Sequence, residues 1–203
     1  RLQALRHHLR RVDAVLFTHA HADHVAGLDD LRSFNFLQGG RPIPCYGNAH
    51  AMADIARRFH YALNVPPALA GSVPHITCHV VDGAFDLFGL SIVPVPIYHG
   101  RLLVYGYRLG DFAYVTDCNA IPPASMDLLR GLDVLVIDAL RYTPHPTHFT
   151  IPEALDVIAQ LRPRRAYLTH ITHEVDHATT SRELPPGVEL AYDGLTVTVG
   201  GES

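Results

Sequence analysis

The sequence predicts a layered α/β fold with mixed sheets. Short apolar runs, which are typical of buried strands, alternate with helical stretches along the chain. Some strands follow each other across glycine-containing turns, at Gly89 and at Gly110, whereas others are separated by a helix. Hairpins give antiparallel pairs and helical crossovers give parallel pairs, so we expect both kinds. A length of 203 residues predicts one domain.

The first part of the chain is predicted to contain more helix than strand. Leu2, Leu5 and Leu9 recur at helical spacing, and Asn48 is a suitable N-cap for the helix that follows it. Proline and glycine interrupt residues 61–75, which we expect to form a loop or lid. The other expected elements are a helix before residue 12, a strand at 12–17, a helix at 25–37, a strand at 43–46 and a helix at 48–60.

The second part of the chain is predicted to be richer in strands. Gly89 and Gly110 mark hairpins, and Pro152 lies where prolines are tolerated, in the first turn of a helix. The expected strands are 76–81, 84–88, 90–97, 102–109, 112–116, 134–137, 166–169, 188–191 and 195–199. The expected helices are 125–130, 152–161 and 173–182.

The composition excludes several classes of function. The 16 basic residues are all arginine, so Schiff-base chemistry and a phosphate-loop lysine are excluded. A net charge of −4 argues against a nucleic-acid binder, and no apolar run is long enough to span a membrane. Three cysteines without a closely spaced pair predict a reducing, cytoplasmic location. The 15 histidines are the unusual feature, and they suggest that imidazole groups are used.

Four metal-competent side chains follow the first predicted strand, in the segment Thr18-His19-Ala20-His21-Ala22-Asp23-His24. His19 and His21 are two residues apart, so in extended backbone they point the same way and can bind one ion. Asp23 and His24 fall where the chain turns into a helix and can serve a neighbouring ion. The segment follows a buried strand, where α/β proteins place their sites.

This segment resembles the HxHxDH motif of the metallo-β-lactamase superfamily of binuclear metallohydrolases. The resemblance implies a third histidine, a bridging aspartate and a last histidine, each at a strand end. His99, Asp117 and His170 are in those places. By resemblance, the first metal would be held by His19, His21, His99 and Asp117. The second would be held by Asp23, His24, Asp117 and His170.

The resemblance also implies the cofactor and the fold. Nitrogen and carboxylate ligands suit two divalent ions, Zn²⁺ or Mn²⁺, and iron also tolerates this ligand set. The implied fold has four layers, αββα, with two mixed sheets. Family members begin with further strands, so we expect a single metallo-β-lactamase-type domain over residues 1–203 that is truncated at the N-terminus, with its first sheet incomplete. Relatives are often dimers, so a homodimer is expected to be possible.

Within the superfamily the chain resembles phosphodiesterases of the phosphonate-pathway type, a branch related to the tRNA 3′-processing endonucleases. The similarity runs from residue 10 to 199, through YGYRLGDFAYVTDCNAIP, HPTHFT and YLTHITHEVDH. His148 in HPTHFT matches a histidine that assists the leaving group in this branch and is not a metal ligand. An imidazolium can donate a proton to a leaving alkoxide near neutral pH.

The expected function is therefore the hydrolysis of a small, open or cyclic phosphodiester by a hydroxide that bridges two metals, with Asp23 and His148 as catalytic residues. A tRNA 3′-endonuclease, a thioester or lactam hydrolase, and a non-catalytic metal-binding scaffold are the alternatives. The acidic net charge speaks against the first, and the complete ligand set speaks against the last. Whether Arg141, Tyr142 or His145 touches the substrate stays open.

Overall fold

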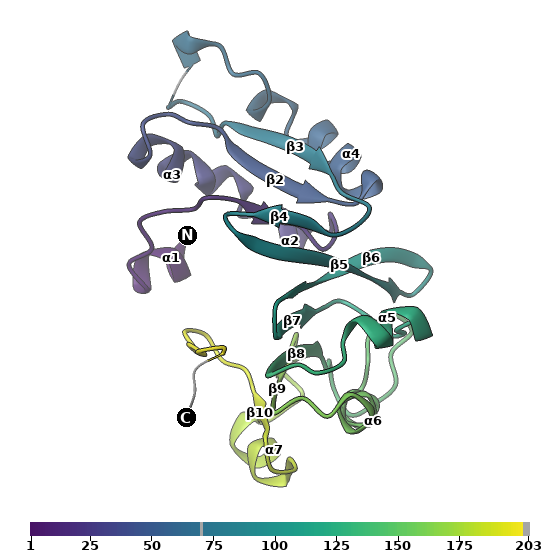
Figure 1. The fold of residues 1–203 in the computed structure, drawn as a ribbon. Coiled ribbons are helices and arrows are strands. Elements are labelled where there is room, and N and C mark those ends of the chain that lie inside the picture. The colour runs from purple at the N-terminus through teal and green to yellow at the C-terminus, as the bar shows by residue number, and fades with distance from the viewer. Residues whose placement is uncertain (70, 201–203) are drawn as a thin grey trace. The chain divides into compact units, whose positions relative to one another are not determined.

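The computed structural model describes residues 1–69 and 71–200. The chain folds as two compact units, Arg1–Asp82 and Gly83–Ser203 (Figure 1). Each unit contains one β-sheet and several helices, which confirms the predicted α/β class with two sheets. The expectation of a single domain stays a prediction. Among the described residues, no helix is both long and apolar enough to cross a membrane.

The first unit contains a three-stranded sheet in the order β1-β2-β3. All of its pairs are parallel, so the expectation that both sheets are mixed is wrong for this one. The reason is that a helical segment lies between each strand and the next, and such crossovers bring strands back in parallel. The elements are α1 (Leu2–Arg6), β1 (Val15–Leu16), α2 (Ala22–Val25), η1 (Leu28–Asp30), α3 (Leu31–Leu37), β2 (Ile43–Gly47), α4 (Ala49–Arg58), η2 (His60–Ala62), η3 (Pro67–Leu69) and β3 (Ile76–Val80).

A local signal explains where the longest helix of the first unit begins. The Asn48 side chain accepts a hydrogen bond from the backbone N–H of Ala51 at 2.8 Å, which confirms it as the N-cap of α4. The helix expected at 25–37 is divided into α2, η1 and α3. The expected loop at 61–75 contains two short 3₁₀ turns, and its residue 70 lies outside the described residues. Ile43, Ile55 and Ile76 form part of the buried core.

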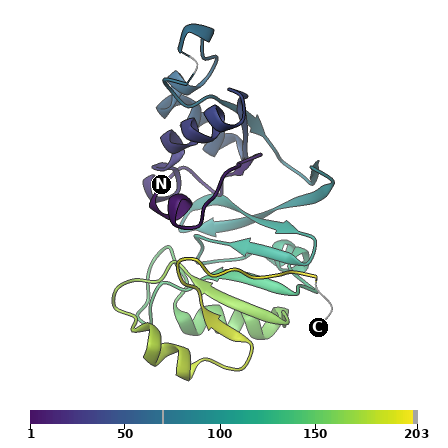
Figure 2. The same cartoon turned by 90° about the vertical axis from the view of Figure 1, so that its left-hand side faces the viewer.

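The second unit contains a seven-stranded sheet in the order β10-β9-β8-β7-β6-β5-β4. Pairs from β4 to β7 are antiparallel and pairs from β7 to β10 are parallel, so this sheet is mixed as expected. Figure 2 shows α7 beside β10. The elements are β4 (Phe85–Leu87), β5 (Leu90–His99), β6 (Leu102–Leu109), β7 (Phe112–Val115), α5 (Pro123–Leu128), β8 (Val134–Asp138), α6 (Ile151–Leu161), β9 (Arg165–Thr169), α7 (His177–Glu183) and β10 (Val188–Leu190).

The strand expected at 195–199 is wrong. This segment follows a turn in which the N–H of Leu195 donates to the carbonyl of Tyr192 at 3.0 Å. The Arg165 guanidinium then donates to the carbonyl of Thr198 at 2.6 Å. A side chain therefore takes a backbone carbonyl that a neighbouring strand would otherwise bind.

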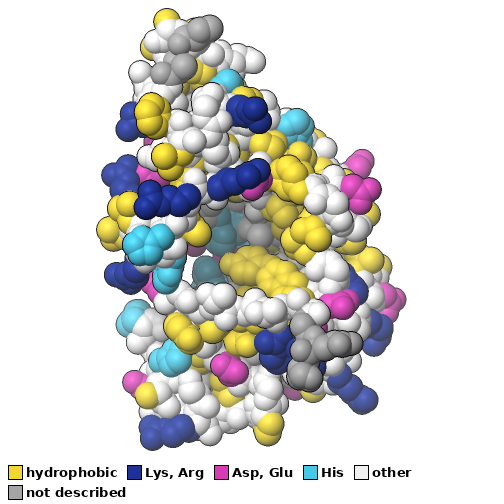
Figure 3. All heavy atoms as spheres, turned by 60° about the vertical axis from the view of Figure 1, so that its left-hand side comes forward, with side chains coloured by type: hydrophobic (Ala, Val, Ile, Leu, Met, Phe, Trp, Pro, Cys, Tyr) yellow, Lys and Arg dark blue, Asp and Glu magenta, His cyan; other side chains and the backbone are white. Residues whose placement is uncertain are grey.

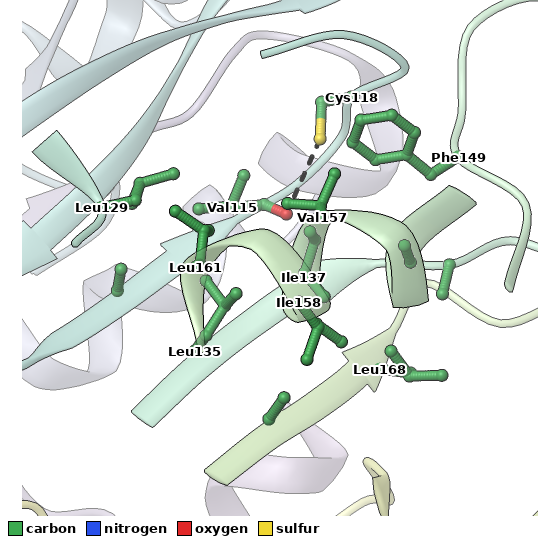
Figure 4. Close-up of a cluster of buried hydrophobic side chains, with 14 of the residues drawn as sticks. Val115, Cys118, Leu129, Leu135, Ile137, Phe149, Val157, Ile158, Leu161 and Leu168 are labelled. Atoms are coloured by element: carbon green, nitrogen blue, oxygen red, sulfur yellow. Dashed lines mark hydrogen bonds between the residues drawn. The ribbon is translucent and has the colours of Figure 1, made fainter. Parts of the chain in front are cut away.

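The core of the second unit lies between α6 and the sheet (Figure 4). Val157, Ile158 and Leu161 on α6 face the sheet residues, among them Ile137 and Leu168, whose side chains are fully buried. The helix begins at a capping box in which Thr150 and Glu153 exchange side-chain hydrogen bonds with each other's backbone. Burial of each large aliphatic side chain contributes about 1.5–3 kcal/mol. The packing fixes the sheet whose edge carries the polar side chains described next.

Candidate active site

Polar side chains gather at one edge of the seven-stranded sheet. Strands β5, β7, β8 and β9 run in the same direction, so their carboxyl ends meet at this edge. His99 is the last residue of β5, and Asp138 is the last residue of β8. Asp117 follows β7 and His170 follows β9. The predicted strand-end positions of His99, Asp117 and His170 thus lie at a common edge.

A hydrogen bond fixes the orientation of His99. Its Nδ1 lies 2.8 Å from the carbonyl oxygen of Thr147. Because a carbonyl can only accept, Nδ1 carries the proton, and the neutral ring has its lone pair at Nε2. The ring is buried and lies 4.6 Å, centroid to centroid, from that of His148. This arrangement is typical of a histidine held ready to bind a metal through Nε2.

Asp117 and His170 form a second close pair at this edge. Asp117 is buried, and its Oδ1 accepts a hydrogen bond from the Thr116 hydroxyl at 2.7 Å. His170 Nε2 lies 3.4 Å from the same oxygen. His170 has a φ of 61°, which turns it out of β9 in a left-handed conformation. A carboxylate and an imidazole thus converge where the resemblance places two ligands.

His148 is held by a buried carboxylate that the sequence analysis missed. Asp138 has no exposed surface, and its Oδ2 lies 2.7 Å from His148 Nδ1 and 2.8 Å from the backbone nitrogen of Cys118. The Cys118 N–H donates to this oxygen, so Asp138 Oδ2 contacts both the Cys118 backbone and the His148 ring, and the carboxylate is held in place. The His148 ring stacks on that of His170 at 4.7 Å with an interplanar angle of 12°. Asp138 therefore sets the tautomer and direction of His148.

A sequence signal for Asp138 existed. It ends the buried run VLVID, and Asp117 follows a strand of the same kind. Burial raises the pKa of Asp138, and the hydrogen bonds from His148 and Cys118 act in the opposite direction. Among the described residues its second oxygen, Oδ1, finds no hydrogen-bond partner, and it lies 4.0 Å from His170 Nδ1. The carboxylate thus faces both histidines of the stacked pair.

The side chains of Arg141 and Tyr142 contact other residues of the chain. The Arg141 guanidinium pairs with Glu174 at 3.0 Å and also donates to the carbonyls of Thr143 and Pro144. The Tyr142 hydroxyl lies 3.3 Å from the Thr180 hydroxyl. These contacts stabilise the 141–148 loop, so we do not assign either side chain to the substrate.

His145 is the third residue of this loop that the sequence left open. Its ring lies 5.0 Å from that of His148, and its Nδ1 accepts weakly from the Thr147 backbone N–H at 3.4 Å. Partial burial and the neighbouring His148 lower the pKa of His145, which favours the neutral ring.

Cys118 lies next to Asp117 but has no reactive character. It is fully buried, and burial raises the pKa of its thiol well above the usual value. Only the thiolate is nucleophilic, so a thiol of this kind is inert. Cys118 therefore packs in the core, and all three cysteines of the chain are free thiols.

The first unit carries the other predicted ligands on a short loop. His19 is buried and His21 is exposed, and their facing nitrogens, His19 Nε2 and His21 Nδ1, lie 2.9 Å apart. The two side chains thus point the same way, as the two-residue spacing predicts. His24 Nε2 lies 3.4 Å from Asp23 Oδ2, at the start of α2. The Asp23 side chain is 63% exposed.

The donor atoms within each unit suit a divalent metal. In the second unit His99, Asp117 and His148 offer atoms that all lie within 4.8 Å of one another, as do those of Asp138, His148 and His170. In the first unit the His19 and His21 nitrogens are close to the separation of about 3.3 Å expected for two nitrogens on one tetrahedral zinc. Imidazole and carboxylate donors of this kind are those that zinc and manganese accept.

Comparisons with known proteins agree with the fold. The family model for the beta-lactamase superfamily domain matches residues 1–171. The crystal structure of a diphosphatase from the PhnP family is 42% identical, with a TM-score of 0.86, and the match covers 96% of this chain and 73% of that one. A ribonuclease Z from Anoxybacillus flavithermus is 25% identical over 91% of this chain and 78% of its own length.

The chain belongs to the metallo-β-lactamase superfamily, in the branch that contains the PhnP family and the ribonucleases Z. These relatives indicate a hydrolytic enzyme. A Porphyromonas gingivalis protein named octanoyltransferase is 36% identical over 98% of this chain. The chain spans only 40% of the length of that relative.

Proposed function

We propose that this chain is a metal-dependent phosphodiesterase acting on a small phosphodiester, open or cyclic, including diesters of diphosphate. The observation that carries the proposal is the Asp138–His148 pair, buried beside His99, Asp117 and His170. A carboxylate-bound imidazole beside metal-competent donors suits hydrolysis with acid assistance to a leaving oxygen. The 42% identity to a PhnP-family diphosphatase supports a phosphate substrate.

The proposed ligands follow the order of the motifs in the sequence. His19, His21, His99 and Asp117 would hold one ion, and Asp23, His24, Asp117 and His170 would hold the other. When bound, two divalent ions lower the pKa of water and neutralise charge on phosphoryl oxygens. Zinc and manganese both suit this donor set, and the proposal does not depend on which is bound.

His148 is the proposed proton donor. Asp138 accepts the Nδ1 proton at 2.7 Å, which stabilises the imidazolium form and directs Nε2 away from the core. Nε2 then donates its proton to the oxygen that leaves phosphorus. Asp23 is the proposed residue that orients the attacking water. No serine, cysteine or lysine nucleophile is required.

The chemistry of the leaving group gives a sharp test of His148. An alkoxide is strongly basic and needs a proton, whereas p-nitrophenolate and phosphate are weakly basic and leave without one. Replacing His148 should therefore slow hydrolysis of a nucleoside 2′,3′-cyclic phosphate far more than that of bis(p-nitrophenyl) phosphate. We expect a loss of about 10²–10⁴-fold for the alkyl leaving group and a much smaller loss for the aryl one.

The experiment compares kcat/KM of the wild type, His148→Ala and His50→Ala on both substrates. His50 is an exposed histidine on α4 and serves as the matched control. Chelation should abolish both activities, and Zn²⁺ or Mn²⁺ should restore them. Equal losses on both substrates in His148→Ala would contradict the proton-donor role. Full activity after chelation would contradict a metal-dependent enzyme.

A tRNA 3′-endonuclease is the second candidate, favoured by the identity to ribonuclease Z. The net charge is −4, and on the face shown in Figure 3 the arginine side chains lie scattered among acidic, apolar and polar ones. Such a surface offers little to a large polyanion. Cleavage of precursor tRNA at a rate above that on small diesters would favour this candidate. The homodimer and the cytoplasmic location stay predictions.

A further inference from the structure

We infer that Arg58 is a positioning residue for the loop that carries His19 and His21. Arg58 is the last residue of α4, and its Nη1 donates a hydrogen bond to the carbonyl oxygen of Ala20. Ala20 is the residue between the two histidines. The inference rests on the proposed metal site, and it adds a role for a side chain outside the ligand set.

The contact connects two parts of the first unit that are far apart in the sequence. Ala20 is buried in the same apolar cluster as Ile55 of α4. The Arg58 side chain is 39% exposed, and its guanidinium reaches the loop. Asp54, one turn earlier on α4, lies 3.7 Å from Arg58 Nη2 and limits the directions the guanidinium can take.

The position of the Ala20 carbonyl decides how the His21 imidazole is oriented relative to that of His19. That carbonyl belongs to the peptide plane between Ala20 and His21, and rotating the plane changes the backbone angles of both residues. The facing nitrogens of His19 and His21 are 2.9 Å apart, so a small rotation separates them. A donor that holds this plane keeps the pair preorganised before a metal arrives. Groups that orient metal ligands in this way are typically worth 10–100-fold in affinity.

The positive charge of Arg58 allows the positioning role to be distinguished from simple charge repulsion by the direction in which metal affinity changes. A guanidinium close to a cation site disfavours metal binding by repulsion. If repulsion were the main effect, removing the charge would tighten metal binding. If positioning is the main effect, removing the hydrogen bond weakens binding in spite of the lost repulsion. The two accounts therefore predict changes in opposite directions.

Arg57 provides a matched control on the same helix. Its side chain is 73% exposed, and its Nη2 binds Asp54 Oδ1 at 2.9 Å. Arg57→Met and Arg58→Met remove the same charge and keep a similar unbranched stem. They differ in whether the Ala20 carbonyl loses its donor.

The experiment measures Zn²⁺ and Mn²⁺ affinity by competition with a chromophoric chelator, for the wild type, Arg57→Met and Arg58→Met. The thermal midpoint of each metal-free protein is measured alongside. Of the two metals, we consider the one that the wild type binds more tightly. We expect Arg58→Met to bind it about tenfold more weakly than Arg57→Met does. The thermal midpoints of the two metal-free variants should be similar.

The outcomes separate the two proposals. No metal binding by the wild type would overturn the proposed function itself. Normal binding by the wild type with equal or tighter binding by Arg58→Met would overturn only the positioning role. A lower midpoint of metal-free Arg58→Met that accounts for its whole loss of affinity would also overturn it, because Arg58 would then support the fold and not the loop.

Discussion

The two clusters of candidate site residues are built in different ways. In the first unit His19, His21, Asp23 and His24 lie within six residues, on a loop and the first turn of a four-residue helix. In the second unit the cluster is drawn from several strand ends and from the loop that carries His148, and most of its members are buried. The first cluster is local in the sequence, whereas the second exists only once the sheet has formed.

The two clusters also differ in the contacts that hold their side chains in place. In the second unit three members of the cluster have a hydrogen-bond partner: His99 has the Thr147 carbonyl, Asp117 has the Thr116 hydroxyl, and His148 has Asp138. In the first unit His19 has the Thr18 hydroxyl and the Ala20 carbonyl has Arg58, whereas Asp23 is largely exposed. We therefore expect the second cluster to be preorganised by the core and the first to depend more on bound metal.

The largest expected effect comes from the two cores. Leu168→Ala in the second unit and Ile43→Ala in the first each remove a fully buried side chain. We expect each to lower the free energy of unfolding by about 2–5 kcal/mol, because a cavity is left behind. Urea denaturation followed by circular dichroism measures this. A single-domain chain should show one transition in both variants, and two separate transitions would contradict that expectation.

The next effect concerns the buried carboxylate behind His148. Asp138→Asn keeps the size of the side chain but removes the charge that stabilises the imidazolium. We expect kcat on an alkyl phosphodiester to fall about 10–100-fold, with a smaller change on bis(p-nitrophenyl) phosphate. The pH profile of kcat should lose its dependence on His148 ionisation.

Asp127→Asn, on the exposed surface of α5, is the control for Asp138→Asn. Unchanged kinetics and pH profile in Asp138→Asn would show that the hydrogen bond to His148 has no catalytic consequence.

The smallest expected effect is a pH dependence of stability in the second unit. The hydrogen bond from Arg164, with Gly200 and Arg165, lowers the pKa of Asp133 below its usual range. A lowered folded-state pKa gives stability that is present above about pH 4 and is lost as the pH falls further. Wild type should therefore exceed Asp133→Asn in urea midpoint at pH 7, and this advantage should be smaller at pH 3. An advantage that is the same at both values would contradict this.

Local patterns predicted most of the elements. The Asn48 cap, the hairpin glycines and the Pro152 helix start are each set by a few neighbouring residues, and the structure agrees with them. The strand expected at 195–199 failed because its apolar alternation could not show that Arg165 takes the Thr198 carbonyl. Pairing depends on partners far away in the sequence, which a local pattern does not contain.

As with the secondary-structure elements, local patterns in the sequence predicted part of the candidate site. The spacing of His19 and His21 predicted that their side chains point the same way, and strand ends predicted the positions of His99, Asp117 and His170. The contacts behind these residues were not predictable. Asp138 and Arg58 act through a tertiary contact to His148 and to the Ala20 carbonyl, and nothing in their own segments identifies those partners.

The central claim is that residues of both clusters contribute to binding two metal ions, and the metal content of the purified chain tests it most directly. Zinc, manganese and iron per chain are measured by mass spectrometry for the wild type, His21→Ala, His99→Ala and the control His50→Ala. We predict two ions per chain in the wild type and the control, and fewer in each ligand variant, with the larger loss in His21→Ala. Fewer than two ions in the wild type, or full occupancy in both ligand variants, would contradict the account.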